Sequence, residues 1–162
     1  MIMEIILRKI EERDNREIAG VIRTVFREFK IDKPGTVYFD PTTDNLFNLF
    51  SIPGSEYWIA EADGVIIGGC GVYPTHGLPD GCAELVKLYL SSSWRGKGVG
   101  WQLMEKTFES AIKFGYRQLY LESLPELRKA ISLYERAGFK NLPEPMGNSG
   151  HFGCNIWMIK DL

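Results

Sequence analysis

Hydrophobic residues recur every three or four positions from Ile18 to Phe29, a spacing that gives a helix one apolar face. Just before this segment, Asp14 precedes Glu17 by three residues, which is the spacing of a capping box. Pro34-Gly35 follows and is typical of a chain break after a helix. The pattern predicts a long amphipathic helix that starts at Asp14.

Two further segments show the same periodicity later in the chain. One runs from Trp101 to Phe114 and is closed by Gly115, and the other begins at Pro125 and is closed by Gly138. A shorter helix is expected from Asp44 to Phe50, because prolines flank that stretch. Helices are therefore predicted both before and after the centre of the chain.

Short hydrophobic runs between turn residues predict the strands. Asp63-Gly64 separates two such runs, and this dipeptide favours the tight type I′ turn of a hairpin. The predicted strands are Met3 to Lys9, Tyr57 to Glu61, Val65 to Gly68, Ala83 to Leu90, Arg117 to Glu122 and Cys154 to Lys160.

Length and charge limit the classes of function. A chain of 162 residues fits a single domain, which we expect to span residues 1–162. The formal net charge of -2 and the sequence pI near 5.8 provide no overall positive field for nucleic acid or an anionic membrane. Any site for an anion must therefore be local.

Cysteine usage and the start of the chain predict a cytoplasmic protein. Cys70, Cys82 and Cys154 are odd in number and widely spaced, which favours reduced thiols. Glu4 interrupts the first apolar stretch, so the start lacks the order of a signal peptide. No run approaches the roughly 18 apolar residues of a membrane span.

A glycine loop lies between a predicted strand and the helix from Trp101. Gly96, Gly98 and Gly100 let the backbone approach a ligand closely, and amides at a helix start favour phosphate groups. Their spacing matches neither G-x-G-x-x-G nor the phosphate loop of nucleotide hydrolases. Glu122 ends the next strand at about the distance of a ribose-binding acid, so a dinucleotide site stays open as an alternative.

Two motifs together resemble the GCN5-related N-acetyltransferases, also called the GNAT family. The family's loop pattern, [Arg/Gln]-x-x-Gly-x-[Gly/Ala], is matched by Arg95, Gly98 and Gly100, and its Leu-Tyr-Glu-x-x-Gly-Phe element is matched from Leu133 to Phe139. The resemblance is strong over residues 82–140 and looser toward the front of the chain.

The resemblance implies an α/β (α+β) fold with a mixed, mostly antiparallel sheet of six or seven strands and helices on both faces. It implies that two parallel strands, ending near Leu90 and Glu122, splay apart to admit acetyl-CoA. Main-chain groups of Leu88 and Leu90 would pair with the pantetheine arm, and an amide near Tyr89 would face the oxyanion. The residues implied in cofactor binding are Leu88, Tyr89, Leu90, Arg95, Gly96, Lys97, Gly98, Val99, Gly100 and Trp101.

Three side chains are candidates for the chemistry of transfer to an amine. Tyr134 matches the family tyrosine that protonates the CoA sulfur, although a tyrosine on a helix face also suits the core. Glu84 and Glu122 resemble the bases of two different branches of the family. Glu84 is expected on the same strand face as Val86, Leu88 and Leu90, where a carboxylate needs a partner or a cleft. The alternative interpretation of Glu84 is a solvated residue at a sheet edge. The alternative interpretation of Glu122 is a partner for a helix end or a basic side chain.

One position departs from the family pattern. Many members carry an asparagine where this chain has Leu127, whose side chain offers no polar contact to the cofactor. Lys129 is a candidate to reach the CoA phosphates instead, or it is a solvated helix lysine. His151 and Cys154 lack a second close pair, so no metal site is expected. The polar segment from 147 to 154 is expected to border the acceptor pocket.

The sequence therefore predicts an acetyl-CoA-dependent N-acetyltransferase that acts on a primary amine of a small molecule or a protein. The alternatives are an acyl-CoA-binding sensor without catalysis and a dinucleotide-binding protein. The acceptor cannot be deduced from the sequence, and a homodimer is an expectation from the family alone.

Overall fold

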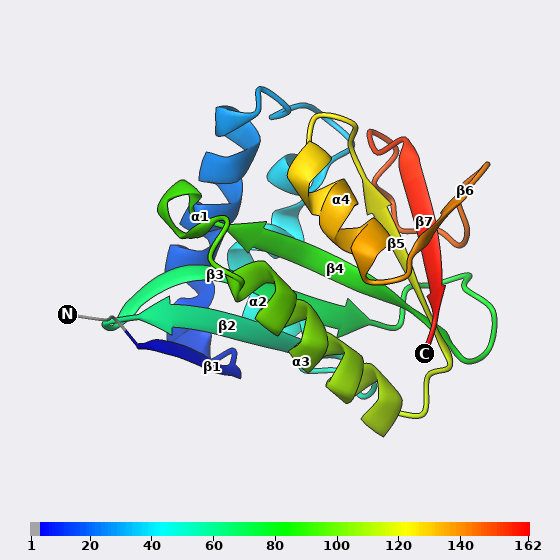
Figure 1. Ribbon diagram of the computed structural model, residues 1–162, viewed down its shortest axis with the longest axis horizontal. Helices are drawn as coiled ribbons and strands as arrows, with labels where there is room; N and C mark the ends of the chain where they lie inside the picture. Colours follow the sequence, from blue (N-terminus) through cyan, green and yellow to red (C-terminus); the bar gives the residue numbers. More distant parts are fainter. Residues whose placement is uncertain (1–3) are drawn as a thin grey trace.

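The protein is described by a computed structural model that covers residues 4–162. One seven-stranded sheet runs through this part of the chain in the order β1-β2-β3-β4-β5-β7-β6 (Figure 1). Neighbouring strands are antiparallel, except for β4 and β5, which are parallel. The strands are β1 Ile5–Lys9, β2 Glu56–Ala62, β3 Val65–Tyr73, β4 Cys82–Leu90, β5 Gln118–Ser123, β6 Lys140–Leu142 and β7 Ile156–Asp161. The mixed, mostly antiparallel sheet confirms the predicted fold class.

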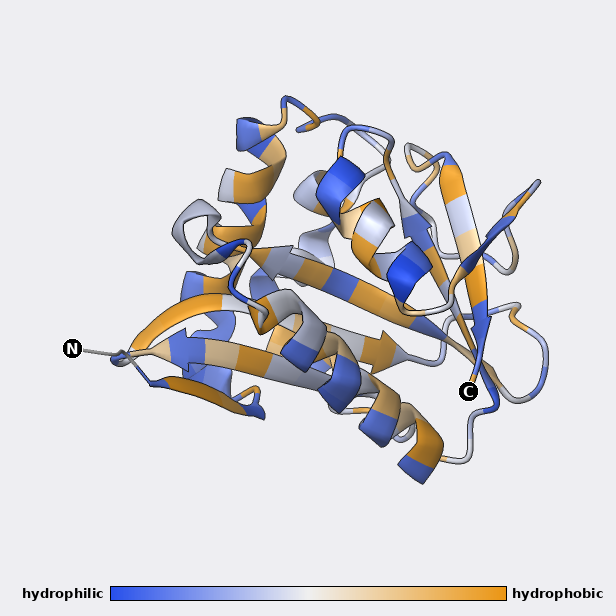
Figure 2. Ribbon diagram, in the orientation of Figure 1, coloured by the Kyte–Doolittle hydropathy of each residue, from blue (hydrophilic) through white to orange (hydrophobic). Residues whose placement is uncertain are grey.

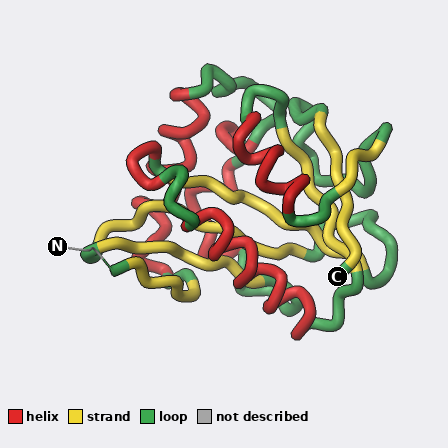
Figure 3. Tube along the Cα trace, viewed as in Figure 1, coloured by secondary structure: helices red, strands yellow, loops and turns green. Residues whose placement is uncertain are grey.

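Helices cover both faces of the sheet (Figure 3). Helix α1 packs against β3 and β4 on one face, and α3 packs against β2, β3 and β4 on the other. The helices are α1 Asn15–Glu28, α2 Leu46–Leu49, α3 Val99–Lys113 and α4 Arg128–Arg136. Hydrophilic and hydrophobic bands alternate along α3 and α4, as expected for helices with one buried side (Figure 2). Two hydrophobic clusters result, one beneath α3 and α4 and one beneath α1 and α2.

Most predicted elements are present, with shifted ends. Met3, at the start of the first predicted strand, lies outside the described residues. Helix α4 begins at Arg128 rather than at Pro125, because a turn from Leu124 to Leu127 comes first. The short strand β6 was not predicted, since its three residues lack a hydrophobic pattern.

The predicted capping box at Asp14 and Glu17 is wrong. The Asp14 carboxylate is buried, accepts the Glu11 N–H at 2.7 Å and binds the Arg8 guanidinium at 2.7 and 2.9 Å. Glu17 instead accepts the N–H of Ile66 on β3 at 2.8 Å. Contacts to the sheet therefore occupy both side chains, and the box forms three residues earlier, between Glu11 and Asp14.

The hairpin between β2 and β3 follows the prediction, with positive φ at both Asp63 (51°) and Gly64 (77°). Strand β3 is longer than predicted because its glycines provide room for a side chain from β2. A Cβ at Gly69 would lie 2.5 Å from the ring of Tyr57. Tyr57 thus lies against β3, and its hydroxyl donates to the Lys87 carbonyl of β4 at 2.7 Å.

Strand β4 contains a bulge at Lys87, where φ is 56° and the register with β3 shifts. The bulge reverses the alternation of side chains, so the predicted common face of Glu84, Leu88 and Leu90 is wrong. Val86, on the face of Glu84, packs in the cluster beneath α1, whereas Leu88 and Leu90 pack in the cluster beneath α3 and α4.

Candidate active site

Strands β4 and β5 are paired only at their first residues and then separate. Pairing ends at Glu84 and Tyr120, and in Figure 1 the arrowheads of the two strands lie far apart. Two cavities lie where the strands diverge, one of about 550 Å³ and one of about 40 Å³. Leu88, Tyr89 and Leu127 line both cavities, which therefore adjoin.

The glycine loop forms one wall of the larger cavity. Gly98, with φ of 83°, is the N-cap of α3, and the first hydrogen bond of the helix runs from Gln102 N–H to the Gly98 carbonyl. Within residues 4–162, the amides from Gly96 to Trp101 have no backbone acceptor. These amides lie at the positive end of the helix dipole, an arrangement that suits an anion.

Cationic side chains complete this wall. Lys129 and Arg136 of α4 line the larger cavity, so Lys129 lies where the sequence placed it as a candidate, while Arg136 was not predicted. Lys97 and Val99 do not line the cavity: the Lys97 ammonium lies over the Trp94 ring, and Val99 is buried in the core. These two residues can offer only their amides.

Arg95 also lines the larger cavity, and its guanidinium is held by contacts within the protein. Its guanidinium pairs with both oxygens of Glu28 on α1 and stacks over the Phe29 ring at 5.0 Å. It also donates to the Leu90 carbonyl at 2.9 and 3.2 Å. Arg95 therefore joins the loop, the end of β4 and the end of α1.

The Leu90 carbonyl thus points away from β3. Ser91 donates its N–H to Ile67 on β3 at 2.8 Å, and main-chain groups alternate in direction along a strand. The amide of Tyr89 accordingly faces β3, and that of Leu90 faces the gap between β4 and β5. By the same alternation the Leu88 amide also faces this gap. Leu88, unlike Leu90, lines the cavity that holds Glu84 and Tyr134, so the expected oxyanion donor near Tyr89 is better placed at Leu88.

Glu84 is buried in the smaller cavity, with 4% of its surface exposed. The Thr75 hydroxyl donates to Glu84 Oε1 at 2.6 Å. Burial raises the pKa of Glu84 to about 7; the charge of Glu122 adds to this rise, while Thr75, His151 and Lys87 oppose it. This carboxyl group can therefore exchange a proton near neutral pH.

Glu122 lines the same cavity, but both of its oxygens are engaged. The Tyr120 hydroxyl donates to Oε2 at 2.6 Å, and the Ser149 hydroxyl donates to Oε1. Tyr120 also accepts the N–H of Met146 at 3.1 Å. Glu122 therefore anchors the segment that precedes β7 through hydroxyl groups, and neither a helix end nor a basic side chain bonds to it in the described residues.

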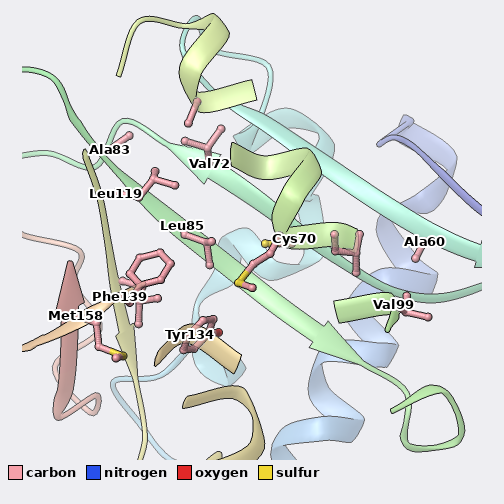
Figure 4. Close-up of a cluster of buried hydrophobic side chains, with 14 of the residues drawn as sticks. Ala60, Cys70, Val72, Ala83, Leu85, Val99, Leu119, Tyr134, Phe139 and Met158 are labelled. Carbon is pink, nitrogen blue, oxygen red and sulfur yellow. The ribbon is translucent and has the colours of Figure 1, made fainter. Parts of the chain in front are cut away.

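Tyr134 approaches the smaller cavity from α4. It is 6% exposed and lies in the cluster with Leu85, Phe139 and Met158 (Figure 4). Burial raises its pKa, so the hydroxyl stays protonated at neutral pH. The structure therefore brings Tyr134, Glu84 and Glu122 to one cavity.

The segment from 147 to 154 also reaches this cavity through His151 and Cys154. His151 Nε2 lies 2.8 Å from Asp40 Oδ2, and this contact holds the pKa of Asp40 well below its usual range. Burial raises the pKa of the Cys154 thiol to about 12, which removes it as a nucleophile at neutral pH.

The sequence analysis did not identify Lys87, which lines the smaller cavity, or Thr75, which donates a hydrogen bond to Glu84. The positive φ of Lys87 has no signal in the sequence. In the described residues, no group of three or more His, Cys, Asp or Glu side chains is arranged to hold a metal ion. None of the helices in residues 4–162 has the length and hydropathy needed to cross a membrane.

Comparison with known proteins identifies relatives across nearly the whole chain. The model of the acetyltransferase (GNAT) family matches residues 13–139. The uncharacterized N-acetyltransferase YjgM of Escherichia coli is 37% identical, over 97% of this chain and 95% of its own. An uncharacterized N-acetyltransferase of Schizosaccharomyces pombe is 28% identical, over 79% of this chain and 77% of its own.

Solved structures share the fold. An acetyltransferase of the GNAT family from Staphylococcus aureus superposes with a TM-score of 0.88 at 18% identity, over 98% of this chain and 99% of its own. The PaiA N-acetyltransferase of Thermoplasma acidophilum, solved in complex with coenzyme A, has a TM-score of 0.75 at 20% identity, over 99% and 100% of the two chains.

Proposed function

Because the chain belongs to the acetyltransferase (GNAT) family, we propose that it moves the acetyl group of acetyl-CoA directly to a primary amine, with both substrates bound together. The acceptor is a small molecule or a protein amino group. The observation that carries this proposal is the cavity shared by Glu84 and Tyr134, which adjoins the larger cavity beneath the glycine loop.

The larger cavity fits acetyl-CoA in its chemistry. The amides from Gly96 to Trp101 bind the pyrophosphate, and Lys129 and Arg136 add positive charge to the same wall. The unpaired edge of β4 at Leu88 and Leu90 binds the pantetheine arm through main-chain hydrogen bonds. The Leu90 N–H serves here, since Arg95 already occupies the Leu90 carbonyl.

Glu84 is the base of the proposed reaction. An alkyl ammonium has a pKa near 10.4, so the acceptor must lose a proton before it can attack a thioester. Glu84 has a pKa of about 7 and only one oxygen bonded to a side chain, whereas hydroxyls engage both oxygens of Glu122. Glu84 therefore takes the proton, and Glu122 orders the wall of the cavity.

Tyr134 donates a proton to the departing sulfur. The neutral amine attacks the carbonyl carbon and forms the C–N bond of a tetrahedral intermediate. As the intermediate collapses, its nitrogen loses the second proton to solvent, the C–S bond breaks, and the sulfur leaves as a thiolate that takes a proton from Tyr134. The Tyr134 hydroxyl remains protonated because burial raises its pKa. Leu88 lines both cavities, and its N–H is the candidate to stabilise the oxyanion of the tetrahedral intermediate, while the Leu90 N–H binds the pantetheine arm.

Release of free thiol from acetyl-CoA, measured over a panel of amines, tests this function. An enzyme releases CoA in step with amine acetylation, whereas a sensor binds acetyl-CoA without turnover. Saturable binding with no thiol release for any amine would favour the sensor. Calorimetric titration of NAD against acetyl-CoA tests the dinucleotide alternative, which requires NAD to bind.

A further inference from the structure

Lys87 is a buried lysine with no explained role. Its side chain is 8% exposed and lines the smaller cavity together with Glu84, Glu122, His151 and Cys154. A positive φ is uncommon for a lysine and costs about 1–2 kcal/mol. The bond from Tyr57 to its carbonyl holds this conformation, and the bulge gives the side chain its direction.

The Lys87 ammonium has no partner in the described part of the chain. Burial lowers the pKa of Lys87, and the nearby carboxylates of Asp40 and Glu84 oppose this without a hydrogen bond to it, so a bound carboxylate would stabilise the charged form. Arg8 Nε is the one fully enclosed side-chain nitrogen or oxygen without a partner in residues 4–162. The Lys87 Nζ is therefore not fully enclosed, and Lys87 lines the smaller cavity.

The carboxylates around Lys87 are already engaged. Asp40 binds His151 and accepts from Thr42, both oxygens of Glu122 accept from hydroxyls, and Glu84 accepts from Thr75. None of them lies close enough to Lys87 for a salt bridge in this part of the structure. A buried cation without a partner is costly, so the site is suited to an anion from outside the chain.

We propose that Lys87 binds a carboxylate of the acceptor, so that the substrate is an amine that also carries a carboxylate, as free amino acids do. This inference rests on the proposed function, because it places the acceptor amine at Glu84 and its carboxylate at Lys87. The two side chains line one cavity, which allows one small molecule to contact both.

Charge and size favour this class over the others. One ammonium balances one carboxylate, whereas a doubly charged phosphate would face the nearby Glu84 and Glu122 with an excess of negative charge. A polyamine would place a second cation against Lys87. The cavity of about 40 Å³ admits a compact group and no large one.

The test compares amino acids with their carboxamides, which keep the amine and lose the negative charge. The panel contains α-, β- and ω-amino acids and dipeptides, each beside its amide, and the enzymes are wild type, Lys87→Met and Lys113→Met. Lys113 is exposed on α3 and serves as the matched control. Wild type should prefer the best acid over its amide by about 10- to 100-fold in kcat/KM.

Lys87→Met should remove this preference by raising KM selectively for the acid. Acid and amide are compared at the pH optimum of each variant, because loss of Lys87 raises the pKa of Glu84. Equal losses for acid and amide would overturn the proposal and assign Lys87 to the proton transfer. A wild-type enzyme that prefers no acid over its amide would overturn it as well. Lys113→Met should match wild type.

A binding measurement separates this inference from the proposed function. Calorimetry with N-acetylated amino acids and their amides needs no turnover, and Lys87→Met should lose only the affinity for the acids. Selective binding of the acids without thiol release would support the carboxylate site and overturn the proposed transferase activity. Thiol release with equal binding of acids and amides would support the transferase activity and overturn the carboxylate site.

Thermal unfolding should show Lys87→Met at least as stable as wild type, because the buried charge is gone.

Discussion

Glu84 and Tyr134 reach the same cavity from opposite faces of the sheet. Glu84 lies on the face of β4 covered by α1, and Tyr134 belongs to the cluster beneath α3 and α4. They share a cavity because β5 stops pairing with β4 at Glu84. The separation of the strands thus allows a base and an acid to act from the two sides of one thioester.

Replacement of Tyr134 by Phe should lower kcat by about 100-fold or more, the usual contribution of a positioned acid. The affinity for acetyl-CoA should stay within about twofold, because the ring and its packing on Phe139 are kept. Tyr116→Phe is the control, since its hydroxyl bonds only to the remote Gly54 carbonyl. An unchanged rate in Tyr134→Phe would remove Tyr134 from the role of proton donor.

The pH profile identifies the base. Glu84 accepts a proton only when ionised, so kcat/KM should rise with pH through an apparent pKa of about 7. Glu84→Gln should lose this rising limb of the pH profile and most of the activity. Glu122→Gln should keep the rising limb. Thr75→Val should shift the limb to higher pH by about one unit, because the hydroxyl bond favours the ionised form. A limb that persists in Glu84→Gln and vanishes in Glu122→Gln would exchange the two roles.

The raised pKa of Glu84 also makes folding depend on pH. The folded state keeps the proton up to about pH 7, whereas the unfolded carboxyl loses it near its ordinary value of 4.5. Stability conferred by the protonated group is present below pH 4.5 and falls by about 3 kcal/mol as the pH rises to 7. In urea unfolding, the free energy of unfolding of Glu84→Gln should therefore rise relative to that of wild type by about 3 kcal/mol between pH 4 and pH 8. A difference that is the same at both pH values would refute the shifted pKa.

Gly98→Ala should weaken acetyl-CoA binding. Gly98 and Gly64 both have positive φ, 83° and 77°, and a Cβ at either position meets nothing within 4 Å. Each alanine should thus cost a similar stability, about 1 kcal/mol, in a denaturation experiment. Only the one at Gly98 lies in the loop that lines the larger cavity, so only this variant should raise the Kd. Equal Kd values for both variants and wild type would exclude the loop as the phosphate site.

The sequence predicted what depends on local patterns. The helices follow from their hydrophobic spacing, the hairpin from Asp63-Gly64, and the glycine loop from its place between strand and helix. The family resemblance named Glu84, Glu122 and Tyr134 as candidates, and all three line the smaller cavity.

Contacts between distant segments were not predictable. The Arg8 guanidinium binds the Asp14 carboxylate, and the Ile66 N–H binds the Glu17 carboxylate. These contacts replace the predicted capping box. The bulge at Lys87 depends on Tyr57, thirty residues earlier, and it changes the face of every side chain that follows on β4. Likewise, Arg95 binds Glu28 of α1 at a sequence separation of 67, which no local pattern indicates.

Binding of acetyl-CoA by the wild-type chain is the most direct test of the proposed function. Titration of acetyl-CoA in a calorimeter should give saturable binding to one site, which CoA competes for and NAD does not. If neither acetyl-CoA nor CoA is bound at about millimolar concentration, the loop amides do not hold a pyrophosphate. The proposed mechanism at Glu84 and Tyr134 would then be contradicted.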